Sequence, residues 1–209
     1  MRRRDAQAAG ASRVATHNAI AAIGQAILGL LASACPRPEF AGAQFELYQG
    51  HNFQSPMDEG ICLYLHRITP ANNIRNLPPR VAPTGKRYRA SLPLDLHYLL
   101  IAWARDAVKQ QRLLGWAMRE MENTPLLHAS LLNQHGPETD TFDSSETVDL
   151  ILDSIPILDM GAIWEVARHH MQPSVAYTAR MVRIDSDVEI TEAGLVQTRV
   201  LGPGKVIER

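Results

Sequence analysis

The chain has 209 residues, of which 45% are hydrophobic, so it is long enough for one domain with a sizeable core and short extensions. Its formal net charge of −1 and pI of about 6.7 give no overall reason to expect a nucleic acid or an anionic membrane as partner. The two cysteines, Cys35 and Cys62, are too few for a four-thiolate zinc site, and we interpret both as buried thiols.

The N-terminal segment has a charged part followed by an apolar part. Arg2–Arg4 open the chain and small polar residues follow, so residues 1–12 are predicted to form a disordered basic arm. Apolar residues between Ile20 and Ala34 then recur at three- and four-residue steps, which is typical of one face of an amphipathic helix. We expect this helix over residues 13–34, before two prolines.

The same segment also imitates a secretion signal. A basic start, an apolar run and small residues before Cys35 are the order found in a bacterial lipoprotein signal sequence. A secreted lipoprotein acylated at Cys35 is therefore kept as an alternative hypothesis. No stretch reaches the roughly 18–20 continuous apolar residues of a membrane span.

Three segments in the first half read as strands because apolar and polar residues alternate in them; they cover residues 43–49, 61–69 and 91–104. In the third, one face is apolar throughout. The other face begins with Asp95 and His97 and turns apolar at Leu99, Ile101 and Trp103. We expect these last three side chains to be covered by a helix or by a neighbouring subunit, and they are candidate protein-contact residues.

Helices and strands alternate in the second half. Asp106 is predicted to cap a helix ending near residue 123, with Leu114, Ala117, Met118 and Met121 as its buried stripe. The later elements expected are a short helix, a strand, a helix capped by Asp159 and a strand, over residues 126–134, 147–157, 160–171 and 174–185.

This order predicts an α+β, or mixed α/β, domain over residues 13–185. It would contain a sheet of about four to six strands, packed mostly on one face by two or three helices. Residues 186–209 would form a C-terminal extension.

The segment at residues 72–89 is longer than an ordinary connection, rich in proline and basic. Stiff prolines reduce the conformational entropy lost when a loop docks on a rigid surface. Tyr88 is its one aromatic residue, so the stacking platform of a single-strand nucleic-acid binder is missing. We predict a protein contact here, with candidate residues Asn72, Asn73, Arg75, Asn76, Pro78, Arg80 and Arg87.

Catalytic and metal-binding patterns are sparse. Asp95 and His97 share a strand face, and His66 could join them from a neighbouring strand, so a small hydrolase or metal-binding protein is a further alternative. However, residues two apart on a strand lie nearly 7 Å apart, and no nucleophile motif accompanies them. His169 and His170 diverge on their predicted helix and cannot share an ion. We therefore expect no enzyme, metal or cofactor.

Several segments occur in an order and spacing that resemble a known family. They are "LYLHRITPANNIRNLPP", "LPLDLHYLLIAWA", "QQRLLGWAMREMENTPLL", "IWEVARHH" and "PSVAYTARMVRID". Together they closely resemble the tail-terminator, or cap, proteins of bacterial extracellular contractile injection systems, which are related to contractile phage tails. The similarity spans residues 15–185, and the chain departs from it in the extra residues 1–12 and a short tail after residue 185.

The resemblance implies a structural protein and not an enzyme. Family members form a six-fold ring on the baseplate-distal end of the inner tube and sheath, where the ring stops polymerisation. It implies as partners other copies of the chain, the inner-tube protein and the sheath protein, with no nucleic acid and no membrane. It also implies assembly in the bacterial cytoplasm, followed by incorporation into the particle.

Overall fold

The central strand of the fold is β5 (Leu92–Trp103), and its alternating sequence explains its position. Leu96, Tyr98 and Leu100 point to one face and are fully buried there. The computed structural model describes residues 15, 17–71, 77–82, 84–136, 141–165 and 172–190. Within these, β5 lies between the long strands β2 and β8, so its backbone is paired along both edges.

Six strands form one mixed sheet in the order β1-β2-β5-β8-β7-β6. The bounds of the other five are β1 (Gln44–Tyr48), β2 (Gly60–Pro70), β6 (Leu126–His128), β7 (Thr147–Asp153) and β8 (Ser174–Ile184). β1 and β2 are parallel, whereas the other neighbouring strands are antiparallel. A separate two-stranded sheet joins β3 (Arg80–Val81) to β4 (Arg87–Tyr88).

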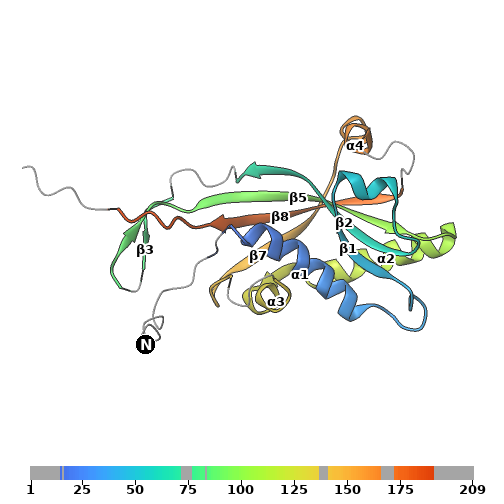
Figure 1. Ribbon diagram of the computed structural model, residues 1–209, viewed down its shortest axis with the longest axis horizontal. Coiled ribbons are helices and arrows are strands. Elements are labelled where there is room, and N and C mark those ends of the chain that lie inside the picture. Colours follow the sequence, from blue (N-terminus) through green and yellow to red (C-terminus); the bar gives the residue numbers. More distant parts are fainter. Residues whose placement is uncertain are drawn as a thin grey trace, which may run out of the picture.

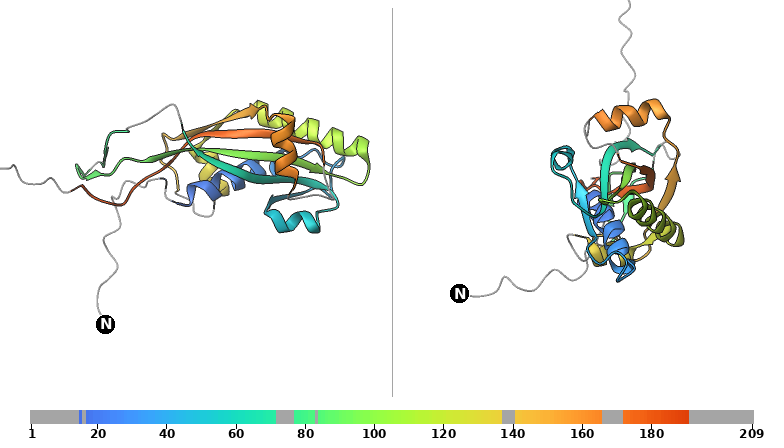
Figure 2. Two further views of the ribbon diagram at one scale, coloured as in Figure 1. Left: turned by 90° about the horizontal axis from the view of Figure 1, so that it is seen from above. Right: turned by 90° about the vertical axis from the view of Figure 1, so that its right-hand side faces the viewer.

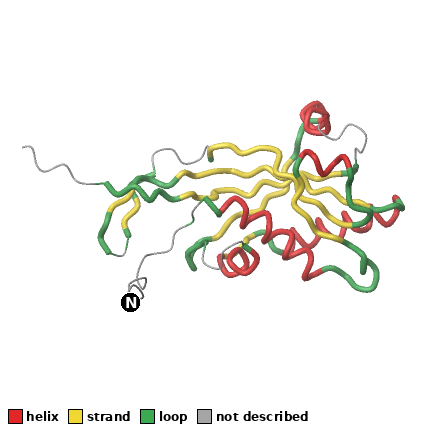
Figure 3. The backbone as a smooth tube through the Cα atoms, viewed as in Figure 1, coloured by secondary structure: helices red, strands yellow, loops and turns green. Residues whose placement is uncertain are grey.

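Three helices cover one face of the sheet. They are α1 (Ala19–Ala34), α2 (Ala107–Asn123) and α3 (Ala129–His135), and Figures 1 and 3 show them together below the strands. The largest hydrophobic core lies between them and the sheet, with Ile23, Leu31, Leu63, Leu100 and Leu113 fully buried in it. The predicted α+β fold, with helices mainly on one face, is confirmed.

The opposite face of the sheet is covered only at one end. The short 3₁₀ helix η1 (Gly50–Gln54) and α4 (Ile157–Trp164) pack over this end, while the rest of the face carries mostly polar side chains, among them His97 and Thr178. The end-on view of Figure 2 places α4 across the sheet from α1, α2 and α3. The switch from polar to apolar residues along β5 therefore marks where this second, smaller core begins.

The predicted cap of α2 is confirmed. Asp106 accepts a hydrogen bond from the Lys109 backbone N–H at 2.8 Å, which satisfies one of the free amides at the helix start. The buried stripe is shifted from the predicted one, since Leu113 replaces Leu114 as its buried leucine. Gln110 also belongs to the observed stripe, where its amide donates to the Ala102 carbonyl oxygen at 2.8 Å.

Other helix boundaries differ from the prediction. α1 begins at Ala19, after Asn18, and not at residue 13. α4 begins at Ile157, so Asp159 lies in its first turn, where a carboxylate favours the helix dipole, and is not the cap. The predicted short helix over residues 126–134 starts with three residues that pair with β7 as β6, and α3 follows.

Candidate functional site

Part of the predicted contact segment folds into a hairpin that the sequence analysis missed. β3 pairs antiparallel with β4, and the Gly85 N–H donates to the Ala82 carbonyl oxygen at 2.8 Å within the turn. Gly85 has a φ of 81°, a left-handed conformation that glycine adopts without steric cost. Figure 1 shows this hairpin beyond the end of the large sheet.

A third extended segment, residues 185–190, lies along β4. The Arg89 N–H donates to the Val188 carbonyl oxygen at 3.0 Å, and the Ile190 N–H donates to the Arg87 carbonyl oxygen at 2.8 Å. We call β3, β4 and residues 185–190 together the projecting hairpin. It is built from two parts of the chain that are far apart in sequence, which is why local patterns did not predict it.

Two ion pairs hold the projecting hairpin together. The Arg80 guanidinium lies 4.4 Å from the centroid of the Tyr88 ring, and its Nε lies 3.4 Å from Asp185 Oδ2. Lys86 Nζ lies 3.0 Å from Glu189 Oε2 in a more exposed pair, of the kind that adds little stability. Arg80 was a candidate contact residue, and here it fastens the hairpin to the segment after β8.

The remaining contact candidates of this segment divide into two groups. Pro78 and Arg87 are exposed. Asn72, Asn73, Arg75 and Asn76 lie outside the described residues, so their contact role stays a prediction.

The three apolar candidates Leu99, Ile101 and Trp103 are covered within the chain. Their side chains are at most 5% exposed and pack against residues of η1 and α4, including Phe53 and Trp164. The Trp103 indole N–H also donates to Cys62 Sγ at 3.1 Å, and burial raises the pKa of the Cys62 thiol to about 12. Of the two coverings expected from the sequence, a helix or a neighbouring subunit, the structure has the chain's own helices.

The segment before Cys35 is part of the domain. α1 supplies seven buried hydrophobic residues to the main core, and Cys35 lies directly after its last turn. The Cys35 thiol is partly buried, donates to the Phe40 carbonyl oxygen at 3.8 Å and has a pKa that burial raises. None of the helices in the described ranges is long and apolar enough to cross a membrane.

His97 belongs to a hydrogen-bonded chain that crosses four neighbouring strands. Its Nε2 lies 2.9 Å from Thr69 Oγ1 on β2, and its Nδ1 lies 3.1 Å from Thr178 Oγ1 on β8. The Thr178 hydroxyl in turn donates to Asp153 Oδ2 on β7 at 2.9 Å. Because the Thr178 hydroxyl donates its one proton to Asp153, His97 Nδ1 is the donor to Thr178, and in a neutral ring Nε2 then accepts from Thr69.

Asp95 does not take part in this chain. Its Oδ1 accepts a hydrogen bond from the Met181 N–H at 3.0 Å, where the register between β5 and β8 shifts and Met181 has a φ of 62°. The carboxylate therefore fastens a bulge, and it does not orient His97. Among the described residues, no group of three or more His, Cys, Asp or Glu side chains could hold a metal ion.

His66 lies beside this chain and is partly buried. Its ring centroid is 6.2 Å from that of His97, and its Nε2 has no hydrogen-bond partner among the described residues. Burial, and secondly the proximity of His97 and Arg67, lower the pKa of His66 below its ordinary value of 6.5.

We expect the stability of the protein to fall as the pH drops below about 6.5, because unfolded His66 then binds a proton more readily than folded His66. Replacement of His66 by Gln should reduce this pH dependence. The measurement is the urea midpoint at about pH 7.5 and about pH 5.5, with the exposed His51→Gln as the matched control. An equal loss of midpoint on acidification in wild type and His66→Gln would contradict the assignment.

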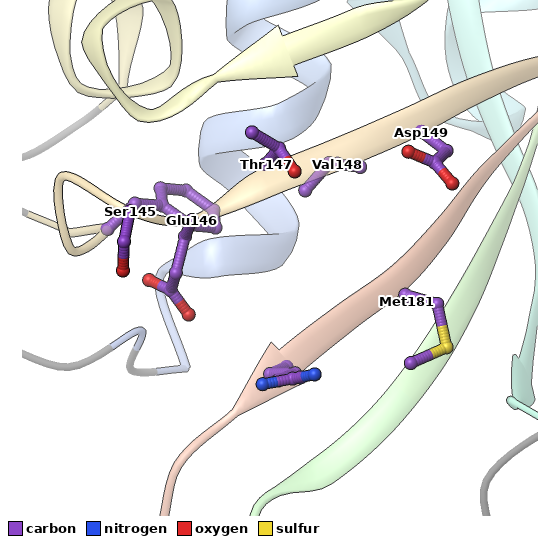
Figure 4. A pocket seen from close by; sticks show the side chains of 8 residues that line it. Ser145, Glu146, Thr147, Val148, Asp149 and Met181 are labelled. Carbon is purple, nitrogen blue, oxygen red and sulfur yellow. The ribbon is translucent and has the colours of Figure 1, made fainter.

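A cavity of about 330 Å³ opens between the start of β7 and the end of β8. Figure 4 shows the two strands diverging around it, because β7 pairs with β8 only from Asp149 onward. Its wall carries both signs of charge, from Glu146 and Arg183. Burial raises the pKa of the Glu146 carboxyl.

The contacts described above do not identify a protein family, but comparison with known proteins does. The family model described as the Pvc16 N-terminal domain matches residues 22–198. The chain belongs to this family. The family resemblance inferred from the sequence is thereby confirmed, and no match was found among curated protein sequences.

Two solved structures share the fold of this Pvc16 N-terminal domain. The PVC sheath/tube terminator of an extracellular contractile injection system, in its extended state, superposes with a TM-score of 0.59 at 10% sequence identity, covering 91% of this chain and 63% of that one. The tube-terminating cap of the anti-feeding prophage gives a TM-score of 0.50 at 12% identity, covering 88% and 60%. The chain thus spans less than two thirds of the length of either protein.

The family match includes most of α1, which precedes Cys35, and the segment after β8 that pairs with β4. It begins at residue 22, within α1, so most of this helix belongs to the matched Pvc16 N-terminal domain. It ends at residue 198, beyond the segment that pairs with β4. The projecting hairpin is therefore contained in the matched range.

Proposed function

We propose that this protein is the structural cap, or tail terminator, of a contractile injection system. In this proposal, the chain forms a six-fold ring on the baseplate-distal end of the inner tube and sheath and ends their polymerisation. The observation that carries the proposal is the family match over residues 22–198, and the shared fold with two terminators supports it.

The protein acts in this proposal through binding and not through catalysis. Its partners are other copies of itself, the inner-tube protein and the sheath protein, without nucleic acid or membrane. It is assembled in the bacterial cytoplasm and then remains part of the particle. Asp95, the carboxylate expected beside His97 in the hydrolase alternative, is hydrogen-bonded to the Met181 N–H and does not orient that imidazole.

Residues 72–89 are proposed as a contact segment at the terminated end or between neighbouring subunits. Exposed prolines such as Pro78 cannot donate the hydrogen bonds needed to extend a sheet, which suits a surface that stops growth. Arg75 and Asn76 offer donors for the exposed carbonyl groups of a terminal layer.

The test is polymerisation of the inner-tube protein with and without this chain, followed by length measurement in negative-stain images. We expect shorter tubes of narrow length distribution, each with a ring at one end. Replacement of Arg75 and Asn76 by Ala should restore uncontrolled lengths while changing stability by only about 0.5 kcal/mol or less, and the exposed Arg119→Ala on α2 should cap normally. Tubes whose lengths do not respond to the wild-type chain would contradict the proposed function.

A further inference from the structure

The large sheet has an open edge at β1. This strand stands first in the strand order, so it pairs only with β2. The Gln44 N–H donates to the Glu59 carbonyl oxygen at 3.0 Å, which turns the backbone of Gln44 toward β2. Because backbone groups alternate in direction along a strand, those of Phe45 and Leu47 point away from β2. Among the described residues, these groups have no hydrogen-bond partner.

A groove of about 450 Å³ lies between this open edge and helix α1, and Figure 1 shows the two elements next to each other. Phe45 and Leu47 line it from β1, and Leu28 and Ala32 line it from α1. The polar residues Gln25 and His135 also line it. We call this groove, together with the outer edge of β1, the β1 groove.

An open strand edge beside apolar side chains is suited to an extended peptide that adds as a strand. Backbone hydrogen bonds to the edge provide affinity, and every second side chain of the peptide enters the groove. β6, at the other end of the sheet, has only three residues, whereas β1 has five. The β1 groove is therefore the longer of the two edges for such a peptide.

The chain itself contains a segment with the right composition. Residues 195–201, with the sequence LVQTRVL, lie outside the described residues, and their pattern predicts a strand. Val196, Thr198 and Val200 are β-branched and alternate with longer side chains, and a glycine stands at each end of the run. A single strand is not stable alone, because its backbone groups need the edge of another strand.

This segment cannot run along the β1 groove of its own molecule. Through β2 and β5, Tyr48 at the end of β1 is level with Ala176 near the start of β8. From there to Ile184 the strand extends about 26 Å, at about 3.3 Å per residue. Residues 185–190 then follow β4, and Figure 1 shows them leading away beyond the end of the sheet. From residue 190 to residue 195 the chain spans at most about 18 Å, which is too short for a return to β1.

We propose that residues 195–201 of one molecule add as a strand to the β1 groove of a second copy of the same chain. Val196 and Val200 enter the groove, between Phe45 and Leu47 on one side and α1 on the other. Arg199 points to the opposite face of the sheet. Glu46, which is exposed, lies on that same face of β1 and carries the opposite charge.

The donated segment and the groove are different parts of the chain, so the contact is head-to-tail. A head-to-tail contact that repeats with the appropriate rotation closes into a ring. The inference therefore rests on the proposed function, and it names the link between neighbouring subunits of the ring.

Two adjacent prolines test the donated segment. Gln197→Pro/Thr198→Pro removes two successive N–H donors, so one is lost from the β1 edge whichever of them points toward it. We expect the dissociation constant between subunits, from light-scattering mass over a dilution series, to rise at least about tenfold. The same change beyond the run, Lys205→Pro/Val206→Pro, is the matched control and should assemble normally. Unchanged assembly of Gln197→Pro/Thr198→Pro would overturn the inference.

Ala32→Arg tests the groove. Ala32 is exposed on α1, so arginine there should fill the groove without unfolding the chain, and Gln111→Arg on the exposed part of α2 is the control. At a concentration where Ala32→Arg and Gln197→Pro/Thr198→Pro are each monomeric, we expect their mixture to form a dimer and nothing larger. In that dimer the intact segment of the first variant meets the intact groove of the second. A mixture that stays monomeric would overturn the inference.

Amide hydrogen exchange locates the contact. On assembly of the wild-type chain, the amides of Phe45 and Leu47 should become protected, because each N–H then donates to the added strand. The Gln197→Pro/Thr198→Pro protein should show no such protection. Protection that appears only after tube or sheath protein is added would assign the β1 groove to that partner and overturn the inference.

The two proposals fail in different ways. A ring that depends on residues 197 and 198 but does not limit tube length would contradict the cap function alone. A ring that limits tube length and survives the two prolines would contradict the strand contact alone. A chain that stays monomeric at high concentration, even with tube protein present, would contradict both.

Discussion

Replacement of Gly60 by Ala is expected to destabilise the protein by about 3 kcal/mol or more, which is exceptional for the addition of one methyl group. A Cβ atom at this position would lie 2.1 Å from the Gln44 carbonyl oxygen and 2.7 Å from the Gln44 nitrogen, both of them backbone atoms that cannot rotate away. Gly60 also has a φ of 152°, which L side chains rarely adopt. Urea unfolding followed by circular dichroism measures the change.

The matched control is Gly115→Ala. Gly115 lies in the interior of α2, and apart from its chain neighbours and the local helix backbone no atom lies within 4 Å of the place that a Cβ would take. Alanine there should therefore stabilise the helix by about 0.5–1 kcal/mol. The same Gly→Ala substitution is thus expected to lower the stability of the protein at Gly60 and to raise it at Gly115. A Gly60→Ala protein with wild-type stability would show that β1 and β2 separate easily at this point.

Replacement of Ile101 by Ala is expected to cost about 2–5 kcal/mol, the usual range for truncating a fully buried isoleucine. Ile101 is 0% exposed and lies in the smaller core between the sheet, η1 and α4. If it were instead a subunit-contact residue, its truncation would spare the isolated chain and weaken assembly. Chemical denaturation together with light-scattering mass separates the two roles.

Leu158→Ala is the control for this experiment. Leu158 is 84% exposed, so its truncation should change the stability of the isolated chain by no more than about 0.5 kcal/mol. If Ile101→Ala were as stable as Leu158→Ala, the smaller core would contribute little to folding.

Much of the fold could be predicted because its signals are local. The cap at Asp106 and the alternation along β5 depend only on nearby residues, and both are confirmed. The burial of Gln110 in α2 could not be predicted, because it accompanies a hydrogen bond to the Ala102 carbonyl oxygen of another element. Hydrophobic periodicity treats such a residue as exposed.

The candidate site was harder to predict than the fold. The pairing of Asp95 with the Met181 N–H and of His97 with Thr69 and Thr178 depends on strand register, which is set by contacts between distant segments. The projecting hairpin joins β4 to residues 185–190 in the same way. One signal was available in the sequence: residues 72–89 contain basic residues but no acidic ones, and Asp185 and Glu189 supply negative charge to pair with them.

The composition of the projecting hairpin has a practical consequence for shortened versions of the protein. A chain cut after residue 185, where the sequence suggests a domain boundary, would keep every strand of the large sheet. It would lose the backbone partners of Arg87 and Arg89, which lie at Ile190 and Val188. The edge of β4 would then be unpaired. Because an unpaired strand edge is a template for aggregation, we expect the truncated protein to be less soluble.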